Sequence, residues 1–214
     1  MDNKEIYEAI LDASGQYNVP EIKPVTDLKQ VFRLLVIYQL TEDNLNNLNF
    51  YKNEKEIKSV LFDYDYKLIL KGKGYADFLK IVLERFNPVK TGDYKKLAMA
   101  SYHAAKYLIK FSSFDNFVKH IKGRTSDPER VFDFLNEFRK ESSLNSIYLV
   151  RACTFFQVSG LLNVPVPNKK SKDFLMPLCQ FEDDNRLIYK TLLAISKANG
   201  ISCYELNNRI DHIN

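Results

Sequence analysis

The sequence predicts an all-α protein with roughly ten helices, and three kinds of observation support this fold class. Apolar residues recur three and four positions apart along most of the 214 residues, as they do on one face of a helix. No segment alternates apolar and polar residues with a period of two, which is the pattern of a half-buried strand. Residues that favour helix ends border the apolar segments, and the chain has no internal repeat.

Each helix expected in the first half of the chain has an apolar stripe of its own and is bordered by polar residues or glycine. The first runs to Gly15 and can be capped by Asp2 or by Asn3. The others start at Thr26 and at Thr41 and cover about 53–70, 75–86 and 91–111. The last of these is rich in alanine, and such small side chains let a neighbouring helix approach closely.

The helices expected in the second half have clearer end signals. They run from Ser113 to Gly123 and cover about 128–140, 144–160, 170–176, 183–199 and 202–212. Asp127 before Pro128 is a strong start signal, because aspartate favours the N-cap and proline favours the first helical position. Gly200 is expected just after the 183–199 helix, where a left-handed residue commonly ends a helix.

The composition is that of an ordinary globular chain, with 45% apolar and 27% charged residues. A chain of this length buries roughly 70% of its unfolded surface, which is enough for one large core or two small lobes. No segment has the composition of a linker. We therefore interpret the chain as one all-α domain, 1–214, with a candidate N-terminal lobe over 1–90 and a C-terminal part over 91–214.

The chain carries 31 Lys and Arg against 27 Asp and Glu, and this net charge of +4 permits an anionic partner without requiring one. No apolar stretch reaches eighteen residues, and the N-terminus is polar and acidic. We therefore expect no transmembrane helix, no signal or transit peptide and a cytoplasmic location.

Neither the cysteines nor the histidines have the spacing of a metal site or a disulfide framework. They are Cys153, Cys179, Cys203, His103, His120 and His212. We expect the cysteines to be free reduced thiols, and we expect neither a metal nor a cofactor. The segment 71–74 lacks the ending of a phosphate-binding P-loop and is interpreted as an ordinary loop.

A helix, a proline-bearing loop and a basic helix start follow one another over 152–156 and 164–170. The stretches 104–117 and 188–202 flank them with further helical similarity. In this order and spacing, the segments resemble the helix-hairpin-helix DNA glycosylases, in particular the 8-oxoguanine DNA glycosylase-like branch. The resemblance implies a DNA-glycosylase-like fold for about 91–214 and an association with DNA, from which such enzymes flip a damaged base into a cleft.

Two features depart from the pattern of that family. Its proline loop carries a catalytic aspartate, whereas Asn168 stands at the matching position here and cannot act as a general base, a loss that typically costs a factor of about 10²–10⁴. Its hairpin carries glycines that grip a phosphate, whereas 144–151 has no glycine, and no lysine lies near Leu149 or Val150 for strand cleavage. We expect base excision to be reduced or lost, and monofunctional if retained. The alternative for Asn168 is that it only caps the next helix.

Three basic clusters are candidate contacts for nucleic acid. They are Lys169, Lys170 and Lys172 at a helix start, Lys119, Lys122 and Arg124 near a loop, and Lys71 with Lys73. A lysine at a helix N-terminus is electrostatically disfavoured unless an anion lies near it. The interpretation is contact with the backbone of duplex DNA, intact or damaged, and the alternative for each cluster is a solvated surface.

Other functions stay open beside DNA association. A non-enzymatic helical protein-interaction module on the same scaffold would expose an apolar or aromatic patch among dispersed lysines. A protein that binds small molecules or nucleosides would have an aromatic pocket without a basic rim. Because one scaffold hosts many functions, the fold alone does not select among them.

Overall fold

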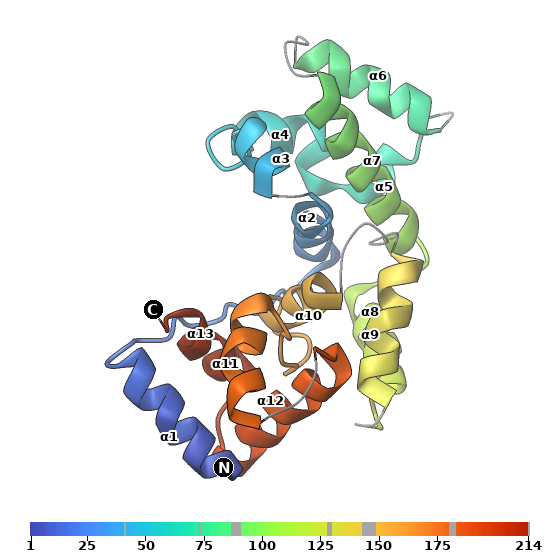
Figure 1. Cartoon of the computed structure of the whole chain (residues 1–214). Helices are drawn as coiled ribbons and strands as arrows, with labels where there is room; N and C mark the ends of the chain where they lie inside the picture. Colours follow the sequence, from blue (N-terminus) through green and yellow to red (C-terminus); the bar gives the residue numbers. More distant parts are fainter. Residues whose placement is uncertain are drawn as a thin grey trace. The chain divides into compact units, whose positions relative to one another are not determined.

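The computed structural model describes residues 1–40, 42–72, 74–86, 91–127, 130–142, 149–179 and 183–213 (Figure 1). Within these ranges the chain forms thirteen α-helices and one short 3-10 helix and no strand, so the predicted all-α class is confirmed. Thr41, Lys73, Pro128 and the expected hairpin stretch 144–148 lie outside the described residues.

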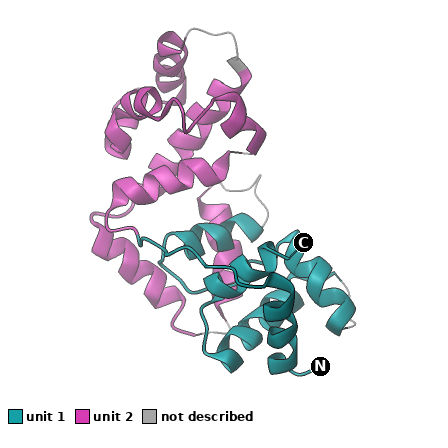
Figure 2. Ribbon diagram, turned by 90° about the vertical axis from the view of Figure 1, so that its left-hand side faces the viewer, with its two compact units in different colours: residues 1–24, 149–214 teal, residues 25–148 magenta. Residues whose placement is uncertain are grey.

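The chain divides into two compact units, which Figure 2 shows in different colours. Unit 1 combines residues 1–24 with residues 149–214, and unit 2 comprises residues 25–148. The helices of unit 1 are α1 (Asn3–Ser14), α10 (Leu149–Val158), α11 (Lys169–Cys179), α12 (Asn185–Asn199) and α13 (Cys203–Asp211). The expected lobe border at residue 90 falls inside unit 2.

Unit 2 contains the remaining helices. They are α2 (Leu28–Gln39), α3 (Glu42–Asn47), α4 (Glu54–Val60), the 3-10 helix η1 (Phe62–Tyr64), α5 (Tyr66–Ile69), α6 (Tyr75–Arg85), α7 (Thr91–Leu108), α8 (Phe114–Arg124) and α9 (Val131–Glu141). The central helix is α7, which packs against α2, α3, α5 and α6. Its buried face is built largely of small residues, which include Ala98, Ala100, Ala104 and Ala105, and such residues permit close packing.

The core of unit 1 joins the two ends of the chain. Ile6 and Ile10 lie one turn apart on α1 and are buried. They pack with apolar residues of α11, α12 and α13, which are Leu175, Ile188, Leu192, Ile195, Leu206 and Ile210. Asp2 starts α1 with a capping box, since its carboxylate accepts the N–H groups of Lys4 and Glu5.

In unit 2, a cluster of aromatic rings packs α7, α8 and α9 against one another. The ring of Tyr107 lies 5.4 Å from Phe138 and 5.6 Å from Phe111, and Phe111 lies 5.1 Å from Phe117, measured between centroids. All three pairs meet edge to face, the arrangement that the quadrupoles of aromatic rings favour. Much of the chain's aromatic content therefore serves packing.

The single helix expected over 53–70 is wrong. Phe62, Asp63 and Tyr64 have positive φ values of 52°, 55° and 61°, and this left-handed turn separates α4 from α5. The apolar spacing continues across the turn because Leu61 and Tyr64 are both buried, so the pattern gave no sign of the break. A left-handed residue other than glycine costs on the order of 1–2 kcal/mol, which packing must offset.

Several helix ends also differ from the expected positions by a residue or a few. The helix expected from Pro128 is α9, which begins at Val131 after Arg130, so Asp127 is not its N-cap. Asp27 rather than Thr26 caps α2, because the Asp27 carboxylate accepts the N–H of Gln30. Gly123 lies within the last turn of α8 instead of closing that helix. Pro177 lies inside α11, which extends three residues beyond the expected end at Met176.

Candidate functional site

The proline-bearing loop of unit 1 starts at a tightly packed glycine and continues through buried valines. Gly160 follows α10 with a φ of 69°, and a Cβ at this position would lie 2.9 Å from the Cβ of Pro24. Only glycine meets both the conformation and the close approach. Further along the loop, Val164 and Val166 are buried.

The centre of the loop is bound by Asn207, a buried side chain on α13. Its Oδ1 accepts the N–H of Val166 at 2.9 Å, and its Nδ2 donates to the carbonyl of Val166 at 2.9 Å. Asn207 Oδ1 also accepts from Gln157 Nε2, which in turn donates to the carbonyl of Val164. The loop backbone is thus paired much as it would be beside a strand, by side chains in place of a ladder.

Asn168 lies at the end of this loop as the N-cap of α11. Its Oδ1 accepts the N–H of Ser171 at 2.8 Å, and its Nδ2 donates to Asp211 Oδ1 at 2.9 Å. The capping alternative is therefore confirmed. Both ends of the amide are thus engaged within unit 1, the oxygen by Ser171 and the nitrogen by Asp211.

Two of the three lysines that follow Asn168 have partners within unit 1, and one of these two forms an ion pair. Lys170 Nζ donates to the carbonyl of Asp211 at the end of α13, and Lys172 Nζ lies 2.6 Å from a carboxylate oxygen of Asp183. The partially negative end of α13 lies near Lys170, and the carboxylate of Asp183 lies near Lys172. Both offset the unfavourable position of a lysine at a helix N-terminus. Lys169 is exposed, and no ion pair is seen for it within the described ranges.

The second predicted basic cluster, Lys119, Lys122 and Arg124, lies in unit 2. Its arginine forms ion pairs, whereas its two lysines are exposed. Arg124 forms ion pairs with Glu137 and Glu141 of α9, and its guanidinium lies 5.2 Å from the ring centroid of Phe134. The two glutamates hold the pKa of Arg124 above its usual value, against the effect of burial. Arg124 therefore joins α8 to α9, whereas Lys119 and Lys122 are exposed. Lys71 is exposed as well.

A longer basic surface lies on the outward face of α7 and the turn after it. We call it the α7 stripe, and it consists of Lys95, Lys96, Met99, Tyr102, His103, Lys106, Ile109 and Lys110. The residues between them on the helix are buried, so a single narrow face is exposed. Within the described part of the chain, none of its four lysines forms an ion pair.

Aromatic rings lie among these lysines. Lys106 Nζ is 5.9 Å from the ring centroid of Tyr102, and Lys110 Nζ is 5.4 Å from that of Tyr107, both within range of a cation–π interaction. Tyr75 of α6 meets Tyr102 edge to face at 5.8 Å. Burial and the adjacent Lys106 lower the pKa of His103.

The carboxylate that lies at the proline loop is that of Asp211, beside Asn168, and it lies outside the hollow next to the loop. A hollow of about 230 Å³ lies beside the loop between Pro24, Leu162 and Tyr204, and no carboxylate is among its described lining residues.

In the described ranges there is no group of three His, Cys, Asp or Glu side chains that could hold a metal ion. Cys153, Cys179 and Cys203 are free thiols. No helix of the described residues has the length and apolar character needed to cross a membrane.

No family model, no curated protein and no solved structure matches this chain.

Two functional features were missed by sequence reasoning, and each had a signal. Asn207 stands on the apolar face of α13 with Cys203, Leu206 and Ile210, at helical spacing. A buried asparagine at such a position needs partners, which here are the loop backbone. Lys95, Lys106 and Lys110 share one face of the alanine-rich helix at spacings of eleven and four, which is a helical repeat.

Proposed function

We propose that the protein associates with DNA by binding its phosphate backbone along the α7 stripe. The observation that carries this proposal is the row of four exposed lysines, Lys95, Lys96, Lys106 and Lys110, that no described carboxylate neutralises. Residues 94–126 contain seven Lys and Arg and one Asp, a local excess larger than the net charge of +4 of the whole chain. A concentration of cations on one face is the electrostatic footprint of a nucleic-acid surface.

The dimensions of the stripe suit a polyanion. From Lys95 to Lys110 the helix and its following turn rise by about 22 Å. A DNA duplex carries one phosphate charge per about 1.7 Å of its axis, so the lysines would meet several phosphates at once. Lysine acts on phosphate as a point charge and reads no base, which makes this binding sequence-independent. Tyr102, at the edge of the row, would pack on the sugar or on an exposed base.

Base excision is not part of the favoured proposal. The amide of Asn168 is used as a helix cap and as a donor to Asp211. The hollow beside the proline loop has no described carboxylate that would replace the missing general base. The proposal of DNA association therefore rests on the α7 stripe, and the family resemblance expected from the sequence adds no active site to it.

The test is fluorescence anisotropy with an unmodified duplex and with one that carries an abasic-site analogue, over a series of salt concentrations. We expect binding that weakens steeply with salt and is similar for both duplexes. Removing Lys106 and Lys110 together by substitution with glutamine should reduce the slope of log affinity against log salt by about 2. The matched control, Lys169→Gln with Lys170→Gln, should leave that slope unchanged.

Three outcomes would count against this proposal. Absence of binding at low salt would remove DNA as a partner. A loss of binding in the Lys169 and Lys170 variant alone would move the contact to the proline loop. A strong preference for the abasic duplex would point to a glycosylase-like cleft instead of a backbone contact.

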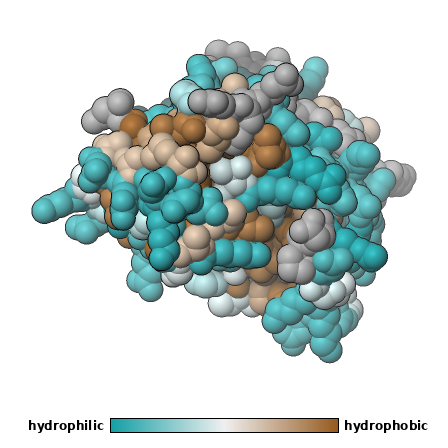
Figure 3. All heavy atoms as spheres, turned by 60° about the horizontal axis from the view of Figure 1, so that its bottom comes forward, coloured by the Kyte–Doolittle hydropathy of each residue, from teal (hydrophilic) through white to brown (hydrophobic). Residues whose placement is uncertain are grey.

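A protein-binding surface is the second candidate, and it is favoured by exposed apolar groups within the same stripe. Met99 and Ile109 are 45% and 49% exposed. On the face drawn in Figure 3, hydrophobic residues likewise form areas bordered by hydrophilic ones. Single exposed apolar residues are normal on soluble surfaces, so the lysines carry more weight. Replacing Met99 and Ile109 with serine should leave DNA affinity nearly unchanged if DNA is the partner.

A further inference from the structure

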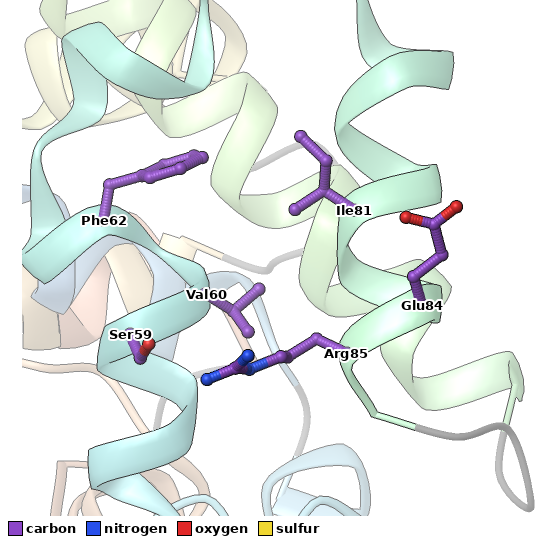
Figure 4. A pocket seen from close by; sticks show the side chains of 6 residues that line it. All are labelled: Ser59, Val60, Phe62, Ile81, Glu84 and Arg85. Atoms are coloured by element: carbon purple, nitrogen blue, oxygen red, sulfur yellow. The ribbon is translucent and has the colours of Figure 1, made fainter.

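Unit 2 contains a hollow of about 410 Å³ between α4, η1 and α6 (Figure 4). The residues that line it are Ser59, Val60, Phe62, Ile81, Glu84 and Arg85. Its volume lies in the range of sites that hold small molecules. It involves no residue of the α7 stripe, so it is a separate feature of the molecule.

One half of the hollow is apolar. Phe62 and Ile81 project toward each other from opposite walls, and Val60 lies below them (Figure 4). Ile81 is 43% exposed, which is high for a large aliphatic side chain in the middle of a helix. An apolar group placed between Phe62 and Ile81 would remove both side chains from water.

The other half of the hollow carries one positive charge. The guanidinium of Arg85 extends from α6 across the hollow toward Ser59 of α4 (Figure 4). No ion pair of Arg85 is seen with the described residues. Glu84 is also among the lining residues, but its carboxylate is directed away from Arg85 (Figure 4), and its Oε1 lies 3.7 Å from Lys80 Nζ. No ion pair joins Glu84 to Arg85 among the described contacts.

The backbone that presents Phe62 is held in its unusual conformation from the other side. Tyr64, the last residue of the left-handed turn, is buried, and its hydroxyl lies 3.5 Å from Glu54 Oε1. Glu54 is fixed in turn by Arg33 at 2.8 Å. This anchoring fixes the wall of the hollow before any ligand arrives, and a preformed site loses less entropy on binding.

We infer that this hollow binds a small monocarboxylate with an apolar chain or ring. The carboxylate would take two hydrogen bonds from the planar fork of Arg85, with Ser59 as a further donor. The apolar part would lie between Phe62 and Ile81. A singly charged acid matches the one guanidinium of the lining, whereas a phosphate dianion would bring a second negative charge close to Glu84. This inference does not depend on the proposed binding of DNA.

The test is titration of the full-length protein with octanoate, followed by isothermal calorimetry and by amide chemical shifts. Octanol is titrated in parallel as the uncharged analogue. We expect octanoate to bind saturably and to shift the amides around Ser59 and Ile81. Arg85→Gln should weaken octanoate binding by about tenfold or more, because a charge-assisted pair is lost. Lys29→Gln, which removes a like charge from α2, a helix with no residue in the lining, should change it by less than about twofold.

Two further variants separate recognition of the acid from general effects. Arg85→Lys keeps the charge without the fork and should bind octanoate with intermediate affinity. Ile81→Ser removes the apolar wall at an exposed position and should weaken octanoate while leaving the fold intact. The inference is overturned if millimolar octanoate does not bind. It is equally overturned if Arg85→Gln binds octanoate as well as the unaltered chain does, or if octanol binds as tightly as octanoate.

Discussion

At the scale of single residues, the side chain of Asn207 connects the proline-bearing loop to α13 and forms four hydrogen bonds. Its Oδ1 accepts hydrogen bonds from the N–H of Val166 and from Gln157 Nε2. Its Nδ2 donates to the carbonyl of Val166 and to Ser171 Oγ. The side chain is 2% exposed, so none of these bonds exchanges with bulk water. Because an unpaired buried polar group costs more than a made bond contributes, the network is expected to be sensitive to loss of a single member.

Replacing Asn207 with leucine should lower the free energy of unfolding by about 2 kcal/mol, because the N–H of Val166 loses its partner while staying buried. The carbonyl of Val166 keeps the N–H of Asn168 and the hydroxyl of Ser171 as donors. Urea denaturation followed by circular dichroism measures the change. Asn208→Ala is the matched control, since the Asn208 amide bonds only within its own helix and is half-buried. It should cost about 0.5 kcal/mol or less. Equal losses in the two variants would mean that the loop is held by packing instead.

At the scale of helices, the ends were largely predictable because their signals are local. Asp2, Ser113 and Gly200 all occupy the capping positions expected for them. Gly200 has the left-handed φ of 64° that a helix terminus requires. The break at Phe62–Tyr64 was not predictable, since bulky aromatic residues have no local preference for positive φ. The anchor there is Glu54, which binds both Tyr64 and Arg33 from elsewhere in unit 2.

The same contrast applies to the candidate sites. The cap role of Asn168 follows from its position before a basic helix start, and it was foreseen as an alternative. The partner of its amide, Asp211, lies 43 residues along the chain, and no spacing rule connects the two. The lysines of the α7 stripe follow a helical repeat that the sequence analysis missed, and their exposure depends on which faces of α7 are buried.

Two glycines in or after helices should respond to alanine in opposite directions. Gly160→Ala should destabilise the protein by about 2 kcal/mol or more, because its φ of 69° is strained for alanine and the new Cβ meets Pro24. Gly123→Ala should stabilise it by about 0.5–1 kcal/mol, because Gly123 is helical and its Cβ would meet open space. Thermal unfolding of both variants in one buffer is the measurement. A stabilising effect at Gly160 would contradict the close approach of Pro24.

At the scale of the whole molecule, charge and connectivity distinguish the two units. Unit 2 contains 21 Lys and Arg against 16 Asp and Glu, whereas unit 1 contains 10 against 11. The whole basic excess of the chain therefore belongs to unit 2, which is also where the α7 stripe lies. Composition alone conceals this, because unit 1 is assembled from the two ends of the chain and no linker marks its borders.

The discontinuous build of unit 1 predicts how a core substitution is felt. Ile10 is fully buried against α12 and α13, so Ile10→Ala should cost about 2–5 kcal/mol. Hydrogen exchange should become faster in α1, α12 and α13 while α2 and α7 keep their protection, if each unit opens as its own cooperative body. Ile57→Ala is the matched control, since Ile57 is equally buried but lies in α4 of unit 2, and it should produce the reverse pattern. Faster exchange throughout the chain in both variants would show that the two units unfold together.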